Sequence, residues 1–350
     1  MYFISDNAGP VAPEVMAALA KANTGYAMPY GDDDGTLQVR DLVREIFQAP
    51  RAAVHLVATG TAANALSLAT LANPWEVIYS HQDAHTANDE CNGPEFFTGG
   101  SKIMPVGGSG GKIDPSELDR AMAATAAKGL PEMQSGPLTI AQVTEAGTVY
   151  SLRELAALTD IAKRYSARCH MDGARFANAV VALGCTPAEL TWKIGIDALS
   201  FGGTKNGLMG VEAVVLFDPE MSREFELRRK RGAHLFSKNR FLAAQMTAYL
   251  TDGLWLKLAA SANRAAEILE QGILNLPGGV LLQSRQANML FCGWHRAGHK
   301  AAQAAGAKYY IGSHDQTMDG PDQEVVTARL VCNWATTDDD IRQFLAAAIG

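Results

Sequence analysis

Several features that would assign a sequence to a known class of protein are missing from this one. Its five cysteines are scattered and include no Cys-x-x-Cys pair, which favours reduced thiols in a cytoplasmic protein. No apolar run approaches the about 18 residues that span a bilayer, and the N-terminus lacks the basic start and apolar run of a signal peptide. The net charge of −7 disfavours a nucleic-acid binder. We therefore expect a protein that binds neither nucleic acid nor membrane.

Common nucleotide and metal motifs are missing as well. The sequence has no Gly-x-Gly-x-x-Gly fingerprint, which weakens the alternative of a nicotinamide dehydrogenase. The glycine-rich residues 107–112 are followed by Ile113 where a P-loop needs serine or threonine, so we interpret them as a surface turn. His81 and His85 have the spacing of zinc ligands, but Gln82 replaces the glutamate of a metalloprotease, and we predict no metal.

What the sequence does contain is a regular alternation of strands and helices in its first two thirds. Apolar runs predict strands at 52–58, 76–80, 137–143, 168–172, 196–201 and 212–217. Helices are predicted at 61–72, after an N-cap at Asp114, and at 152–165 behind a capping box of Ser151 and Glu154. This alternation predicts an α/β fold with a mostly parallel sheet sandwiched by helices.

The last third of the chain has a different pattern. A long helical region follows residue 217, and a Leu-Pro-Gly-Gly turn at 276–279 then precedes short strands and helices. This order predicts a small α+β domain. Because 350 residues are too many for one small core, we place a large domain at 1–250 and a small C-terminal domain at 251–350.

One lysine, Lys205, lies among glycines and apolar residues in the stretch SFGGTKNGLMG. A lysine in a buried site loses its proton easily, and the neutral amine can form a Schiff base with a carbonyl cofactor. The alternative is a solvent-facing lysine in a glycine-rich turn. This stretch alone leaves both interpretations open.

Other polar residues also follow predicted strands. Gly60 and Thr61 begin a helix whose backbone N–H groups suit a phosphate, although Thr61 as a simple N-cap explains the turn equally well. Asp172 has the place of a residue that pairs with a protonated ring nitrogen, or of a helix cap. His85 suits stacking on a flat cofactor or proton transfer, or is an ordinary loop histidine. The carboxyl ends of parallel strands meet at one sheet edge, so convergence there favours the functional interpretation.

The chain resembles the threonine aldolase family in a series of short motifs: SDNAGP, YGDDDGT, ATGTAAN, DAHTANDECNG, CHMDGAR, SFGGTKNG and TARLV. The resemblance extends from Ser5 to Arg329. It implies a pyridoxal-phosphate (PLP) enzyme with the aspartate-aminotransferase fold, fold type I, in which the N-terminal residues 1–25 contribute to the active site.

The resemblance also implies roles for single residues. Lys205 would form the Schiff base with PLP, Asp172 would pair with the pyridinium nitrogen, and His85 would stack on the ring and act as a base. The remaining cofactor contacts would come from Gly60, Thr61, Arg175, Thr204, Arg229 and Lys230. The substrate contacts would come from Ser5, Asp6, Tyr30, Glu145 and Arg329, with Ser5 and Arg329 on the carboxylate.

Two positions depart from the family pattern. The loop after the strand at 137–143 reads QVTEAG, so Glu145 stands about where many relatives have a histidine. Thr204 stands where many relatives have a serine before the lysine. If the histidine handles the substrate β-hydroxyl in the family, Glu145 with water would take over that task here.

The resemblance implies retro-aldol cleavage of L-threonine, L-allo-threonine and related β-hydroxy-α-amino acids, phenylserine among them, to glycine and an aldehyde. A β-eliminating lyase or an aminotransferase of the same fold is the alternative. A binding protein without activity is disfavoured, because Lys205, Asp172, Arg175 and Arg329 are all present. The resemblance further implies a homodimer or homotetramer with active sites at the dimer interface, where the basic run at 228–231 and the YGDD loop would act on a neighbouring subunit.

Overall fold

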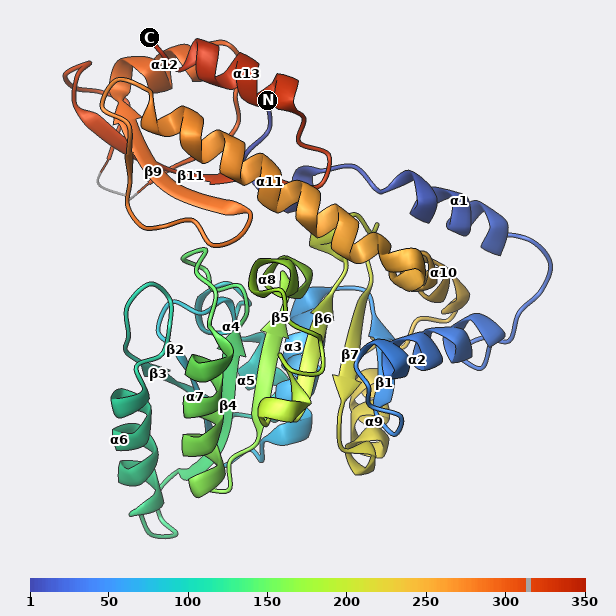
Figure 1. The fold of residues 1–350 in the computed structure, drawn as a ribbon. Coiled ribbons are helices and arrows are strands. Elements are labelled where there is room, and N and C mark those ends of the chain that lie inside the picture. The colour runs from blue at the N-terminus through green and yellow to red at the C-terminus, as the bar shows by residue number, and fades with distance from the viewer. Residues whose placement is uncertain (313–315) are drawn as a thin grey trace.

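Two β-sheets organise the chain (Figure 1). The computed structural model describes residues 1–312 and 316–350. The large sheet has seven strands in the order β1-β7-β6-β5-β4-β2-β3, and the small sheet has four in the order β10-β11-β9-β8. The predicted fold class, a mostly parallel α/β domain with a small α+β domain, is confirmed.

The central strands of the large sheet are buried on both faces, which explains their nearly continuous apolar sequences. The strands are β1 (Ala53–Val57), β2 (Glu76–His81), β3 (Lys102–Val106), β4 (Gln134–Ala141), β5 (Cys169–Gly173), β6 (Ala198–Gly202) and β7 (Glu212–Leu216). Strand β7 runs antiparallel to both of its neighbours, and the remaining pairings are parallel. Sequence did not predict β3, an edge strand that carries Pro105 and an exposed Lys102.

Helices cover both faces of the large sheet. Helices α3 (Gly60–Leu71) and α9 (Ser222–Arg231) pack on one face, while α2 (Asp34–Ile46), α7 (Leu152–Arg164) and α8 (Phe176–Leu183) pack on the other. The other helices of this region are α1 (Pro13–Ala22), α4 (His85–Asn88), α5 (Gly93–Thr98), α6 (Pro115–Ala126) and α10 (Arg240–Leu250). None of the helices in the described residues is long and apolar enough to cross a membrane.

Two of the predicted helix starts are confirmed and a third is corrected. Asp114 caps α6, and the capping box of Ser151 and Glu154 begins α7. Helix α3 is capped by Thr59, whose hydroxyl oxygen accepts the N–H of Ala62 at 3.2 Å. The alternative in which Thr61 caps this helix is therefore wrong, because the helix begins one residue before it.

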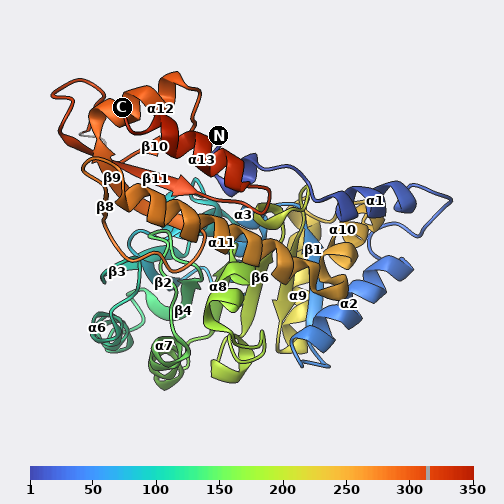
Figure 2. The same cartoon turned by 45° about the horizontal axis from the view of Figure 1, so that its top comes forward.

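The small domain contains β8 (Val280–Leu281), β9 (Met289–His295), β10 (Tyr310–Ile311), β11 (Val325–Val331), α12 (Arg296–Ala304) and α13 (Asp338–Ala347). The N-terminus joins it: Phe3 is fully buried in its core, donates its N–H to the Lys308 carbonyl at 2.8 Å, and accepts the N–H of Val331 at 2.9 Å. The long helix α11 (Leu254–Leu274) runs from the large domain to the small one (Figure 2). The division near residue 250 stays a prediction.

Candidate active site

A cavity of about 700 Å³ lies beyond the carboxyl ends of the central strands, a size typical of small-molecule sites. Most of the residues predicted from the sequence line it. They are Ser5, Gly60, Thr61, His85, Glu145, Asp172, Arg175, Thr204, Lys205 and Arg329. Asp6, Tyr30, Arg229 and Lys230 do not line this cavity.

Lys205 enters the cavity from a single 3₁₀ turn, Thr204–Asn206, directly after β6. Gly207 ends this turn at a φ of +97°, and a Cβ there would lie 3.0 Å from Leu258 Cδ1, so the chain needs glycine at this position. Burial lowers the pKa of Lys205, and the nearby Arg175 guanidinium lowers it further. Lys205 Nζ has no ion-pair or hydrogen-bond partner among the described residues. These surroundings favour the buried, nucleophilic lysine over the solvent-facing one.

Asp172, the fourth residue of β5, is held by two hydrogen bonds. Its Oδ1 accepts the N–H of Ala174 at 3.0 Å, and its Oδ2 accepts Asn64 Nδ2 at 2.8 Å. It does not cap the next helix, because Arg175 is the N-cap residue of α8 and no side chain caps that helix. The helix-cap alternative for Asp172 is therefore wrong, and its carboxylate faces the cavity with a fixed orientation.

His85 is oriented by a buried glutamate. Its Nδ1 lies 2.9 Å from Glu90 Oε1, which also accepts Asn64 Nδ2 at 2.8 Å. This bond to Glu90 raises the pKa of His85, although partial burial opposes it, and burial raises the pKa of Glu90. His85, Glu90 and Asp172 place ligand atoms within 4.8 Å of one another, close enough for a cation. The side-chain amide of Asn64 donates to the carboxylates of both Glu90 and Asp172. The absence of a metal from this site stays a prediction.

Glu145 completes this side of the cavity. Its Oε1 accepts the backbone N–H of His85 at 2.8 Å, while its Oε2 is buried and has no hydrogen-bond partner within the described chain. Burial, together with the negative charge of Asp172, raises the pKa of Glu145 to about 7. A carboxyl group with this pKa can change its protonation state near neutral pH, as acid–base chemistry requires.

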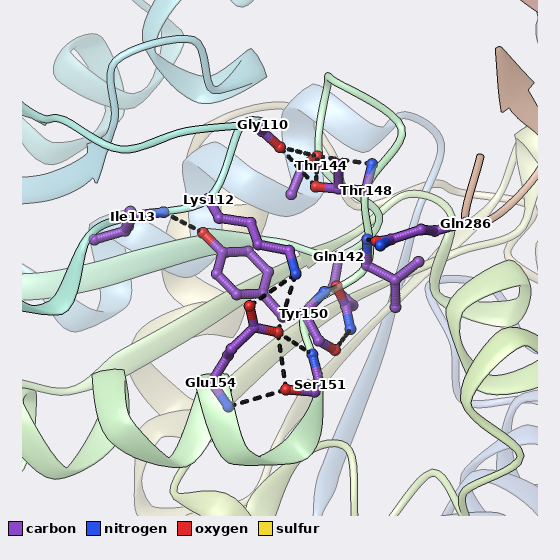
Figure 3. Close-up of polar contacts among 11 residues, drawn as sticks. Gly110, Lys112, Ile113, Gln142, Thr144, Thr148, Tyr150, Ser151, Glu154 and Gln286 are labelled. Carbon is purple, nitrogen blue, oxygen red and sulfur yellow. Dashed lines mark hydrogen bonds and ion pairs between the residues drawn. The ribbon is translucent and has the colours of Figure 1, made fainter. Parts of the chain in front are cut away.

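The loop that carries Glu145 is fixed by a network of polar contacts (Figure 3). The hydroxyl groups of Thr144 and Thr148 both donate to the carbonyl oxygen of Gly110, at 3.3 and 2.6 Å. The side-chain amide of Gln142 pairs with the backbone of Tyr150 through two hydrogen bonds of 2.9 and 3.0 Å. The predicted glycine-rich turn thus packs against this loop and helps to set its position.

Two arginines supply positive charge. Arg175 binds both carboxylate oxygens of Asp6, with Nε at 2.6 Å from Oδ2 and Nη2 at 2.9 Å from Oδ1. Burial would raise the pKa of Asp6, but the charges of Arg175 and Lys205 lower it overall. Arg329 extends from β11 and donates its Nη2–H to the carbonyl oxygen of Ile4 at 3.1 Å, beside Ser5. Asp6 therefore fixes Arg175 from behind the cavity lining.

The first turn of α3 offers an anion site. A Cβ on Gly60 would meet no atom within 4 Å, so the space above the helix start is open. Gly60 and Thr61 line the cavity there, and unpaired N–H groups at the start of a 12-residue helix attract phosphate.

The outlying predicted residues lie elsewhere in the chain. Arg229 is buried, where its Nη1 donates to the Leu56 carbonyl oxygen at 3.2 Å and burial lowers its pKa to about 10. The basic run at 228–231 is therefore not exposed along its whole length. Lys230 Nζ lies 4.8 Å from the ring centroid of Tyr30, which is 46% exposed. Tyr30 and Lys230, about 200 positions apart, thus share one exposed contact.

Two polar residues of the site were missed in the sequence. Asn64 is the one amide in a buried helix rich in alanine and leucine, and Glu212 is a lone carboxylate at the start of an apolar strand. Glu212 lines the cavity, accepts the N–H of Gly203 at 2.6 Å, and has its pKa raised to about 7 by burial. An amide or carboxylate in a buried, mostly apolar element was the signal that could have found both.

The residues of the cavity fit PLP. They provide an amine without a partner at Lys205, a fixed carboxylate at Asp172 for a ring nitrogen, and a helix start for a phosphate. This arrangement at the carboxyl edge of a mostly parallel sheet, with a small α+β domain above it, defines a PLP enzyme of fold type I.

Comparison with known proteins identifies the family. A family model described as beta-eliminating lyase matches residues 2–295. Low specificity L-threonine aldolases of Pseudomonas sp. and Pseudomonas aeruginosa are each 38% identical, covering 98% and 97% of this chain and 96% and 95% of their own. The structure of Leishmania major threonine aldolase shares the fold, with a TM-score of 0.90 and 24% identity over 99% of this chain and 98% of that one. The chain belongs to the beta-eliminating lyase family and, within it, to the threonine aldolases, whose cofactor is PLP.

Proposed function

We propose that this protein is an L-threonine aldolase of low specificity. It cleaves L-threonine, L-allo-threonine and related β-hydroxy-α-amino acids, including phenylserine, to glycine and an aldehyde. The observation that carries the proposal is the meeting of Lys205, Asp172, His85 and Glu145 in one cavity. The identity of 38% to two low specificity L-threonine aldolases over nearly the whole chain supports it.

Each predicted cofactor residue has a task in this proposal. Lys205 Nζ would attach the cofactor, and the Asp172 carboxylate would pair with a protonated ring nitrogen. The first turn of α3 at Gly60 and Thr61, together with the Thr204 hydroxyl, would hold the phosphate, and Arg175 would hold the ring hydroxyl. Bound PLP supplies an electron sink for the electron pair that stays on Cα when the Cα–Cβ bond breaks.

The substrate is held by the opposite side of the cavity. Arg329 and Ser5 bind its carboxylate, which leaves the β-hydroxyl toward His85 and Glu145. Because His85 Nδ1 is hydrogen-bonded to Glu90, its Nε2 is the atom that accepts the β-hydroxyl proton. Glu145, which lines the cavity beside His85, binds the same hydroxyl directly or through a water molecule.

The oligomeric state belongs to the proposal too. We expect a homodimer or homotetramer in which Tyr30 and Lys230 contribute to a neighbouring active site, whereas the predicted contribution of Arg229 is disfavoured by its burial against Leu56. The exposed contact between Tyr30 and Lys230, outside the cavity lining, supports this arrangement. The cytoplasmic location expected from the cysteines stays a prediction.

The test is a product assay on the purified protein with added PLP. L-Threonine is expected to yield glycine and acetaldehyde in equal amounts, and phenylserine is expected to yield glycine and benzaldehyde. The second candidate is a β-eliminating lyase, which the description of the matching family favours, or an aminotransferase of the same fold. Release of a keto acid without aldehyde would establish that candidate and refute the aldolase.

A further inference from the structure

Tyr310 contacts Arg329 across the small sheet. The two residues are directly opposite each other in the antiparallel pair of β10 and β11, so their side chains leave the sheet on the same face. Arg329 Cζ lies 4.7 Å from the centroid of the Tyr310 ring, within the range of a cation–π contact. The guanidinium group therefore lies against the Tyr310 ring.

The charge of Arg329 has no carboxylate partner among the described residues. Its Nη2–H donates to the Ile4 carbonyl oxygen, and its Nε is buried without a hydrogen-bond partner there. Asp6 is not available, because both of its oxygens already bind Arg175. The remaining Nη N–H groups have no acceptor among the described residues, and Arg329 lines the cavity, so its guanidinium group is suited to an incoming anion.

The two contacts together fix the orientation of the guanidinium plane. An arginine side chain loses considerable rotamer entropy when it is ordered, and a ligand that must order it binds more weakly. The Tyr310 ring and the Ile4 carbonyl oxygen each hold the guanidinium group in place. The remaining Nη N–H groups, which no described residue accepts, are left for the ligand in the cavity that Arg329 lines.

We propose that Tyr310 is a positioning residue that keeps the Arg329 guanidinium ready to bind the carboxylate of the substrate. The inference rests on the proposed function to the extent that the ligand is an α-amino acid. Tyr310 is 52% exposed and does not line the cavity, so it acts through Arg329. An edge tyrosine with only a structural task would affect ligands with and without a carboxylate equally.

The experiment compares two ligands that differ only in the carboxylate. Glycine and methylamine are titrated separately into the PLP-loaded protein, and the dissociation constants come from the change in the absorbance of bound PLP. We expect Tyr310→Leu to weaken glycine about three- to fivefold and to leave methylamine unchanged. Tyr310→Phe keeps the ring and is expected to match the wild type within about twofold.

Three further variants test whether the effect of Tyr310→Leu on glycine binding comes from the contact with Arg329. Tyr310→Val replaces Tyr310→Leu if the latter does not fold, since valine suits a strand. Val325→Ala, at an exposed position on the neighbouring strand β11, is the control for a general effect on the small sheet. In an Arg329→Gln background, Tyr310→Leu is expected to have no further effect on glycine, because the group it positions is gone.

The outcomes separate this inference from the proposed function. Absence of aldehyde from the wild type would refute the aldolase, yet the glycine and methylamine titrations would still test Tyr310. Equal weakening of both ligands, or glycine binding unchanged in Tyr310→Leu, would overturn the positioning role. Selective loss of glycine affinity with rescue by Tyr310→Phe would establish it.

Discussion

The two sides of the cavity are built in different ways. The cofactor wall, formed by Lys205, Asp172 and Asn64 and supported by Glu90, comes from the large domain, and the carboxylates of Asp172 and Glu90 each accept two hydrogen bonds. The carboxylate wall, formed by Ser5 and Arg329 and supported by Tyr310, comes from the N-terminus and the small domain. The Arg329 guanidinium group has two partners there, the Ile4 carbonyl oxygen and the half-exposed Tyr310 ring.

This difference agrees with how long each proposed ligand stays bound: PLP remains in the site, whereas the substrate leaves after each turnover. A cofactor that stays bound is best served by buried groups that are fixed in advance, and such groups need not open to solvent. A substrate that enters and leaves at every turnover needs a charge that remains free for it. Variants of the cofactor wall should therefore remove the reaction, whereas variants of the carboxylate wall should mainly weaken substrate binding.

The largest effect is expected from Lys205→Ala in the cofactor wall. Loss of the only cavity lysine should reduce glycine and aldehyde formation by about 10⁴-fold or more, and PLP absorbance should no longer follow the protein through gel filtration. Because burial lowers the pKa of Lys205, its charge opposes folding, and the Tm of the variant should not fall below that of the wild type when both are free of PLP. Lys193→Ala, at an exposed lysine, serves as the control. Retained turnover in Lys205→Ala would refute the assignment of this wall.

Much of the cofactor wall was predictable because its residues follow strands. Lys205 and Asp172 stand at or directly after apolar runs, and Gly60 follows another, so sheet topology alone brings them to one edge. The strand and helix periods at these places are local properties of the sequence.

The other parts depend on contacts between distant residues, which a local pattern does not record. The role of Asn64 depends on its hydrogen bonds to Glu90 and Asp172, which lie 26 and 108 positions away in the sequence. Phe3 joins the small domain through Lys308, near the other end of the chain. Hydrophobicity shows that Phe3 is buried somewhere, but it does not indicate in which core.

The next effect is expected from Arg329→Lys in the carboxylate wall. A lysine keeps the charge but loses the planar pair of donors that binds both carboxylate oxygens, so kcat/KM for L-threonine should fall about 100-fold. The dissociation constant for PLP should stay within about twofold, since the cofactor wall is untouched. Arg264→Lys, on the exposed side of α11, is the matched control. Equal loss of PLP and substrate affinity would contradict the division into two walls.

A smaller effect is expected from Glu145→Gln, which lies between the walls. With the pKa of Glu145 near 7, the ionised carboxylate forms as the pH rises through 7, and kcat/KM should rise over the same interval. Glutamine keeps the N–H contact from His85 but has no charge, so we expect about a tenfold loss at pH 8 and a pH profile without this rise.

The same variant is expected to lose activity at pH 8 without losing stability. Folding holds a proton on Glu145 that the unfolded chain releases at its ordinary pKa of 4.5, so the wild type loses stability between pH 4.5 and about 7. Glu145→Gln avoids this loss, and its Tm at pH 8 should equal or exceed that of the wild type. A lower Tm at pH 8, with the profile unchanged, would indicate that Glu145 is ionised and structural.

The smallest effect is expected outside both walls, at Lys230. If Lys230 and Tyr30 contribute to the phosphate site of a neighbouring subunit, Lys230→Gln removes one partly screened charge, and PLP should bind about threefold more weakly. Arg231→Gln removes the same charge from the next, exposed position of α9 and should leave PLP affinity unchanged. Equal weakening of PLP binding in both variants would show a general effect of net charge. Loss of PLP affinity confined to Lys230→Gln would show that a residue of the neighbouring subunit contributes to the cofactor wall.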